Sequence, residues 1–225
     1  MAITVQDLIN GVRMTQLDDP EAITWPDDVM IIALNQALSM LALMRPDSTS
    51  TIGIINLTKG SRQFLPADGL RLLRVIRNVT WNGDPGTDPV IGRAVRIIQM
   101  EALDSMSPDW HNTPATTAIH EYCFDARSPK HFYVYPSPPT AGALQLEIEY
   151  SKEPPQLSIV DMTSDLPVDS IYMQPLQELM LYKLLSGDSR NGGVNGMPHL
   201  NTATSVLGIK ASSEEASSPA RKTQA

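Results

Sequence analysis

Four histidines and one cysteine are the side chains of this 225-residue chain best suited to nucleophilic, acid–base or metal chemistry. His120 and His131 fall on neighbouring predicted strands, and Glu121 and Asp125 lie close to them in sequence. A metal site or a hydrolytic acid–base pair would need these side chains to converge, yet no ligand spacing such as His-Glu-x-x-His is present. We therefore expect structural roles for them, and a hydrolase using His120 or His131 stays open as an alternative.

The single cysteine offers no clear chemistry either. Cys123 alternates with Tyr122 and Phe124 in a predicted strand, where a free thiol usually packs as a small apolar side chain. No basic residue or helix start lies nearby in sequence to lower its pKa. Glycine-rich phosphate loops and the Gly-x-Ser-x-Gly nucleophile elbow are also missing from the sequence. We expect no catalytic residues, no metal site and no cofactor.

Two further patterns could bind a ligand. The pairs Asp18-Asp19 and Asp27-Asp28 could hold a divalent ion, although carboxylates at the start of a helix are the simpler explanation. Phe132, Tyr133 and Tyr135 could stack bases in an oligonucleotide-binding barrel, or they could form part of a β core. A β-barrel module that binds a ligand or single-stranded nucleic acid through Tyr133 and Tyr135 is therefore kept as the second functional hypothesis.

The charge balance limits the partners of this chain. Lys and Arg number 17 against 25 Asp and Glu, which gives a formal net charge of −8. An acidic chain is poorly suited to gripping phosphates, but it could surround DNA without gripping it. The longest apolar run, Met40–Met44, is far shorter than the roughly 20 residues that span a bilayer, and no secretion signal is visible. We expect a soluble protein of a reducing compartment with no membrane partner.

Helical periodicity near both ends of the chain predicts four helices, at about 4–16, 26–45, 170–186 and 202–210. Thr4 and Asp7 fit a capping box, Pro26 fits a first helical residue, and Asn201 can cap the last helix. None of these helices can bury its apolar face alone, so we expect a four-helix bundle. The residues predicted for its core include Leu8, Ile9, Val12, Ile32, Met40 and Leu179.

Between the helices, from about 50 to 157, the apolar period changes from 3.6 to 2. Six or so short strands separated by turns predict a small, mainly antiparallel sandwich or barrel, and one short helix is expected at 101–106. The expected fold class is α+β. Residues 1–48 and 160–210 would form the discontinuous helical bundle, 49–159 the inserted β domain, and 211–225 an extended, flexible tail.

Several segments, taken in order, resemble the phage head-to-tail connector (adaptor) proteins, a tail tubular protein A-like family. The resemblance spans about residues 4–210, and the glycine-rich stretch 187–201 departs from it, because the family usually carries a longer polar and aromatic helix there. The segments that carry the resemblance are Val5–Ile9, Trp25–Asp27, Leu43–Asp47, Arg62–Leu73, Leu103-Asp104 with Pro108–Trp110, Phe124-Asp125 with Pro129, Phe132–Pro136, Glu149–Ser151 and Leu207–Lys210.

The resemblance implies a structural protein without enzymatic activity. Such a subunit would form a ring, often of twelve copies, between the portal protein and the downstream tail or nozzle protein of a short-tailed phage. Double-stranded DNA would pass through the ring without sequence-specific binding, and the protein, made in the host cytoplasm, would belong to the virion neck. In this family the C-terminal segment commonly reaches into the portal ring, so the expected portal-docking residues are Val206, Leu207, Ile209 and Lys210.

Overall fold

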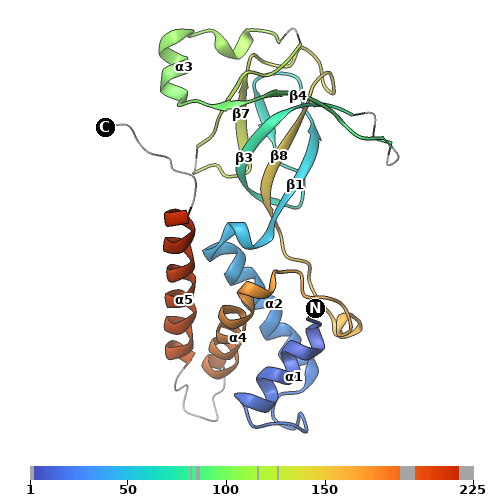
Figure 1. The fold of residues 1–225 in the computed structure, drawn as a ribbon, viewed down its shortest axis with the longest axis vertical. Helices are drawn as coiled ribbons and strands as arrows, with labels where there is room; N and C mark the ends of the chain where they lie inside the picture. The colour runs from blue at the N-terminus through green and yellow to red at the C-terminus, as the bar shows by residue number, and fades with distance from the viewer. Residues whose placement is uncertain are drawn as a thin grey trace. The chain divides into compact units, whose positions relative to one another are not determined.

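The computed structural model of the protein describes residues 3–81, 83–84, 87–115, 117–125, 127–187 and 196–217, with side chains described as far as Gly208 in the last range. The chain forms two compact units, one made of Met1–Ser48 with Pro154–Ala225 and the other of Thr49–Glu153. The first unit is helical and the second consists mainly of β-strands (Figure 1). The predicted α+β class is confirmed.

The two N-terminal helices begin close to where the sequence places them. Helix α1 (Val5–Thr15) starts at the predicted capping box, in which Thr4 Oγ1 accepts from the Asp7 amide at 3.1 Å and the Asp7 carboxylate accepts from the Thr4 amide at 3.2 Å. Helix α2 (Asp27–Met44) follows Pro26, which is its extended N-cap and not its first helical residue. A short 3₁₀ helix, η1 (Pro46–Thr49), comes after the end of α2.

The C-terminal helices depart further from the prediction. Helix α4 (Met173–Gly187) follows the 3₁₀ turns η3 (Ile159–Asp161) and η4 (Ser170–Tyr172) and ends at Gly187. Helix α5 runs over Gly196–Ser217, so Asn201 lies inside it. The early start is possible because Pro198 lies in the first turn, where no intrahelical donor is needed. Part of the expected tail, 211–217, is therefore helical, while 188–195 and 218–225 lie outside the described residues.

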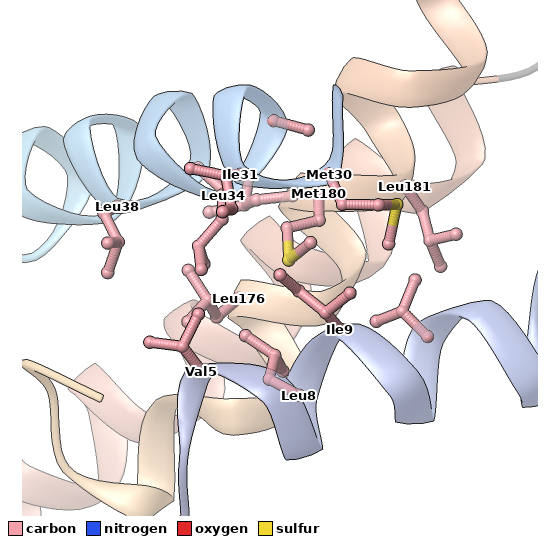
Figure 2. Packing of buried hydrophobic residues seen from close by; sticks show 14 of the residues in the cluster. Val5, Leu8, Ile9, Met30, Ile31, Leu34, Leu38, Leu176, Met180 and Leu181 are labelled. Carbon is pink, nitrogen blue, oxygen red and sulfur yellow. The ribbon is translucent and has the colours of Figure 1, made fainter. Parts of the chain in front are cut away.

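Apolar side chains of α1, α2, α4 and α5 share one buried core in the helical unit. Figure 2 shows those of α1, α2 and α4. The prediction for Ile32 is wrong, because this side chain is 57% exposed, and Met40 is only partly buried. Helix α2 is apolar on almost every side, and its neighbours cover the face of Met30, Leu34 and Leu41. Four of the six predicted core residues are buried: Leu8, Ile9, Val12 and Leu179.

The apolar character of α2 also raises the question of whether this helix could cross a membrane. It is the one helix in the described part of the chain that is long and apolar enough to cross a membrane by length and composition alone. Eight of its residues are buried in the protein, and Figure 2 shows Ile31, Leu34 and Leu38 among the core side chains. Packing against the other helices accounts for these eight residues, whereas Ile32, Leu43 and Met44 of α2 are exposed.

The second unit contains two four-stranded sheets. One has the order β1 (Ser50–Asn56), β8 (Gln145–Lys152), β3 (Gly69–Thr80), β4 (Val90–Ala94), and the other β2 (Arg62–Phe64), β7 (His131–Tyr135), β6 (Glu121–Cys123), β5 (Arg96–Ile97). Neighbouring strands are antiparallel except for the parallel pair β5–β6. Side chains from both sheets, among them Leu72, Phe132 and Ile148, form one core.

Helix α3 (Met100–Met106) and the 3₁₀ helix η2 (Trp110–Asn112) follow β5 in the same unit. The short helix predicted at 101–106 thus starts one residue earlier. Strands β4 and β5 had no counterpart in the prediction. All five residues of β4 are exposed, so neither of its faces needs to be apolar. Its sequence accordingly lacks the alternation of apolar and polar residues that would predict a strand.

We expect Leu8→Ala to lower the free energy of unfolding of the helical unit by about 2–5 kcal/mol, because it opens a cavity in a closely packed core. The measurement is urea unfolding followed by circular dichroism. Ile32→Ala on exposed α2 surface is the matched control, with an expected change within about 0.5 kcal/mol. Equal losses from the two variants would contradict the assignment of the buried faces.

Candidate functional site

The structure does not bring the two candidate catalytic histidines together. In the β6–β7 ladder Glu121 lies opposite Tyr135, and the His120 amide donates to the Tyr135 carbonyl at 2.9 Å. His131 lies four residues before Tyr135, about 13 Å away along an extended strand. Its ring instead contacts the edge of Phe64 at 4.9 Å between centroids. Within the described ranges, no three His, Cys, Asp or Glu side chains form a group that could hold a metal ion.

Cys123 is a buried core residue, as its strand position predicts. It is 2% exposed and packs with Leu103 and Trp110 between α3, η2 and β6. Burial, followed by the nearby charges of Asp104 and Glu101, raises the pKa of the thiol to about 11. The thiolate needed by a nucleophile or a metal ligand is therefore disfavoured.

Tyr133 and Tyr135 also belong to this small cluster. Both are partly buried against it, and the Tyr133 ring meets the Trp110 ring edge-on at 6.2 Å. Trp110 in turn stacks on His111, whose Nδ1 lies 2.7 Å from Ser61 Oγ. A base-stacking platform needs exposed ring faces, whereas the Tyr133 ring packs against Trp110 and His111 and Tyr135 is partly buried against the cluster.

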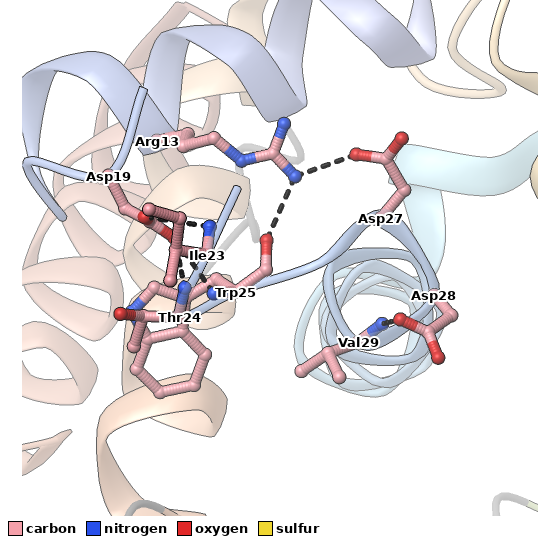
Figure 3. Close-up of polar contacts among 8 residues, drawn as sticks. All are labelled: Arg13, Asp19, Ile23, Thr24, Trp25, Asp27, Asp28 and Val29. Carbon is pink, nitrogen blue, oxygen red and sulfur yellow. Dashed lines mark hydrogen bonds and ion pairs between the residues drawn. The ribbon is translucent and has the colours of Figure 1, made fainter. Parts of the chain in front are cut away.

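Three carboxylates of the two acidic pairs, those of Asp19, Asp27 and Asp28, have polar contacts at or near the connection between α1 and α2 (Figure 3). Asp19 accepts hydrogen bonds from the amides of Ile23, Thr24 and Trp25 at 2.8–3.0 Å. Burial acts to raise the pKa of Asp19, but these three donors and the charge of Arg13 hold it below its usual value. The Asp19 carboxylate thus closes the loop between the two helices.

Asp27 and Asp28 likewise have local partners. Arg13, which is 6% exposed, donates from Nη2 to the Trp25 carbonyl at 2.9 Å and to Asp27 at 2.7 Å (Figure 3). Asp28 accepts from the Val29 amide at 2.9 Å. Asp27 and Asp28 lie in the first turn of α2, as the helix-start interpretation predicts. Asp19 instead lies in the connection between α1 and α2 and binds its main-chain amides.

The predicted portal-docking residues lie on α5, which is fixed to the rest of the helical unit. Leu207 is 5% exposed and belongs to the core, and its carbonyl accepts from Arg45 Nη1 at 3.3 Å. Val206 is half-buried. The side chains of Ile209 and Lys210 lie outside those that the structure describes. Leu207 thus has a packing role within its own subunit.

The start of α5 is held equally closely. A Cβ at Gly196 would lie 2.0 Å from Ser186 Oγ and 2.6 Å from the Tyr182 carbonyl oxygen, so only glycine allows this approach to α4. His199 Nδ1 lies 2.7 Å from a Glu178 carboxylate oxygen. At the other end, Arg45 connects the C-terminal end of α2 to α5. The first half of α5 is an integral part of the helical unit.

Comparison with known protein families identifies the class of protein to which this chain belongs. The family model for SU10 adaptor protein matches residues 3–223, which cover both units. The chain belongs to the SU10 adaptor protein family. No match was found among curated proteins. The predicted membership of a phage head-to-tail adaptor family is confirmed.

The family assigns this adaptor a structural role in the virion and does not place it in an enzyme class. Three polar residues of this adaptor, Arg13, Asp19 and Arg45, connect elements of the helical unit.

We expect Cys123 of the folded adaptor to react slowly with a thiol reagent at pH 8. A pKa of about 11 leaves about one thiol in a thousand ionised, and burial adds a steric block. Reaction should become rapid in denaturant, and the rate of reagent consumption measures both states. Rapid stoichiometric labelling of the folded protein would contradict the buried position.

A second prediction concerns the polar contacts at the end of α2. Hydrogen bonds from Arg45 Nε and Nη2, at 2.8 and 2.7 Å, are the largest influence on Asp47 and hold its pKa well below the usual range. Partial burial opposes this effect, and Tyr172 Oη adds to it at 2.8 Å. A lowered pKa stabilises the fold above the unfolded-state value of about 3.9, and the stabilisation disappears as pH falls below it.

We therefore expect the melting temperature of the wild type to fall more steeply than that of Asp47→Asn between about pH 5 and pH 2, with the variant less stable at pH 7. Thermal unfolding followed by circular dichroism measures both curves. The other carboxylates are present in both proteins, so their contributions cancel when one curve is subtracted from the other. Parallel curves would show that Asp47 is not linked to folding.

Proposed function

We propose that this adaptor forms a ring that joins the portal protein to the tail or nozzle of a short-tailed phage. The observation that carries the proposal is the family match over residues 3–223, which includes the helical unit, the β unit and α5. The proposal includes a ring of twelve copies, a location in the virion neck after synthesis in the host cytoplasm, and packing of α1, α2, α4 and α5 as a four-helix bundle. The inserted β unit would form a sandwich or barrel.

The charge distribution supports passage of DNA through such a ring. The helical unit carries 14 Asp and Glu against seven Lys and Arg, and the β unit carries 11 against ten. Twelve copies at −8 each would carry about −96, a potential that repels phosphates and favours free movement of DNA. Sequence-specific binding of the duplex is not part of the proposal.

Portal docking is assigned to the end of α5. Leu207 and Ala203 are occupied in the core of their own subunit, so the docking segment begins after them, at Ile209 and Lys210. The four docking residues expected from the family resemblance thus fall into two groups. Leu207 and its half-buried neighbour Val206 anchor the helix, and the residues beyond Gly208 face the portal. Weak contacts of this second group would be multiplied by ring symmetry.

The test is decoration of portal-bearing, tail-less heads by a chain truncated after Gly208. This truncation retains Ala203 and Leu207, whereas a cut after Gly187 would also remove core residues. We expect the truncated adaptor to fold, as judged by circular dichroism, and to decorate heads at least about tenfold less than the full chain.

The control is a chain truncated after Ser217, the last residue of α5, which locates the docking segment within 209–217 or beyond it. Equal decoration by the Gly208 truncation and the full chain would place portal docking elsewhere in the helical unit. A full chain that never decorates portal-bearing heads would contradict the proposed function itself.

A further inference from the structure

The continuous segment Val90–Ile97 is an exposed border of the β unit. It contains β4, at the edge of one sheet, and β5, at the edge of the other. Seven of its eight residues are exposed, and only Val95 is buried. Val90, Ile91 and Ile97 are 69%, 61% and 52% exposed, so large apolar side chains are accessible at both ends of this segment.

This segment is also basic within an acidic protein. It carries Arg93 and Arg96 and no carboxylate. Arg96 lies 3.6 Å from Glu121, while the exposed Arg93 side chain has no ion pair among the described residues. The β4–β5 segment therefore combines apolar contact area with an available guanidinium group.

A second exposed segment, at 159–171 of the helical unit, has the opposite charge. Ile159, Val160 and Ile171 are 59%, 86% and 62% exposed, and Asp165 and Asp169 are exposed between them. In Figure 1 it is the gold-to-orange stretch beside the N-terminus. Apolar side chains and carboxylates alternate along it.

The 159–171 segment is held in place before any partner binds. The Val5 and Gln6 amides donate to the carbonyls of Ser164 and Met162 at 3.0 and 2.9 Å, and the Leu166 amide donates to the Ile3 carbonyl at 3.0 Å. Docking onto it would therefore require little ordering of the main chain.

Its carboxylates open onto a pocket of about 390 Å³, whose apolar walls are Ile3, Leu166, Val168 and Met173. Neither Asp165 nor Asp169 has an ion pair among the described residues. An arginine side chain matches such a pocket, because its aliphatic stem packs on apolar walls while its guanidinium binds carboxylates.

We infer that the β4–β5 segment of one copy docks onto the 159–171 segment of the next copy, with Arg93 directed to Asp165 and Asp169. The two surfaces differ, so the contact is head-to-tail, and a head-to-tail contact closes into a ring when its rotation permits. The inference rests on the proposed ring function and identifies the surfaces that build it. The partner that binds the 159–171 segment is thus a second copy of this chain.

The test exchanges charges between the two surfaces. Arg93→Glu alone and Asp165→Lys with Asp169→Lys alone should each decorate portal-bearing heads at least about tenfold less than the wild type, because like charges then face each other. An equimolar mixture of the two variants should restore decoration, since the new carboxylate of one variant meets the new ammonium groups of the other in an alternating ring. Only contacts between copies can give this restoration.

Lys59→Glu is the matched control, because it makes the same charge change at another exposed position of the β unit and should decorate like the wild type. Circular dichroism checks that all variants fold. Decoration by Arg93→Glu at the wild-type level, or a mixture no better than its components, would overturn the inference while the adaptor function stands.

Absence of decoration by the wild type would instead contradict the proposed function. Sedimentation of the same samples without heads then tests the inference separately. In that assay the mixture must form larger species than either variant alone, and equal sedimentation of mixture and variants would overturn the inference.

Discussion

The helical unit depends on a single constraint, which is that its core takes side chains from both ends of the chain. Leu8 and Ile9 of α1 and Leu34 of α2 are buried with Met180 of α4 and Leu207 of α5. No helix here could bury its apolar face alone. The two ends must therefore meet, and Thr49–Glu153 leaves this unit and returns as a separate compact unit. A family match that spans residues 3–223 agrees with such shared folding, because neither end of the chain is dispensable for the core.

Because the core of the helical unit includes residues of α5, this helix has two parts with different roles. Up to Leu207 the helix completes the core and accepts a hydrogen bond from Arg45. The backbone of α5 continues beyond Leu207 to Ser217. A helix that is anchored at one end and continues beyond its anchor can present a segment to a partner without loosening the subunit, which is the property a connector between two larger assemblies needs.

Most of the correct predictions from the sequence rest on patterns among neighbouring residues. The Thr4–Asp7 capping box and the strict alternation of β8 depend on neighbouring residues, so both were found. The buried face of α2 depends on distant partners, and Ile32 and Leu34 are equally apolar, so periodicity chose the wrong side. β4 was missed because an exposed edge strand with Gly92 and Arg93 has no alternation. Arg93 and Asp169 were not found, since only the fold shows their exposure and the pocket.

The proposed place of this adaptor is a ring on the portal in the neck of the virion. Cryo-electron microscopy of phage particles, with the neck reconstructed at a resolution that shows helices, tests it most directly. We expect a closed ring beneath the portal into which both the helical unit and the β unit fit, with the C-terminal end of α5 against portal density. A neck whose density accommodates neither unit, or a portal with no ring attached, would contradict it.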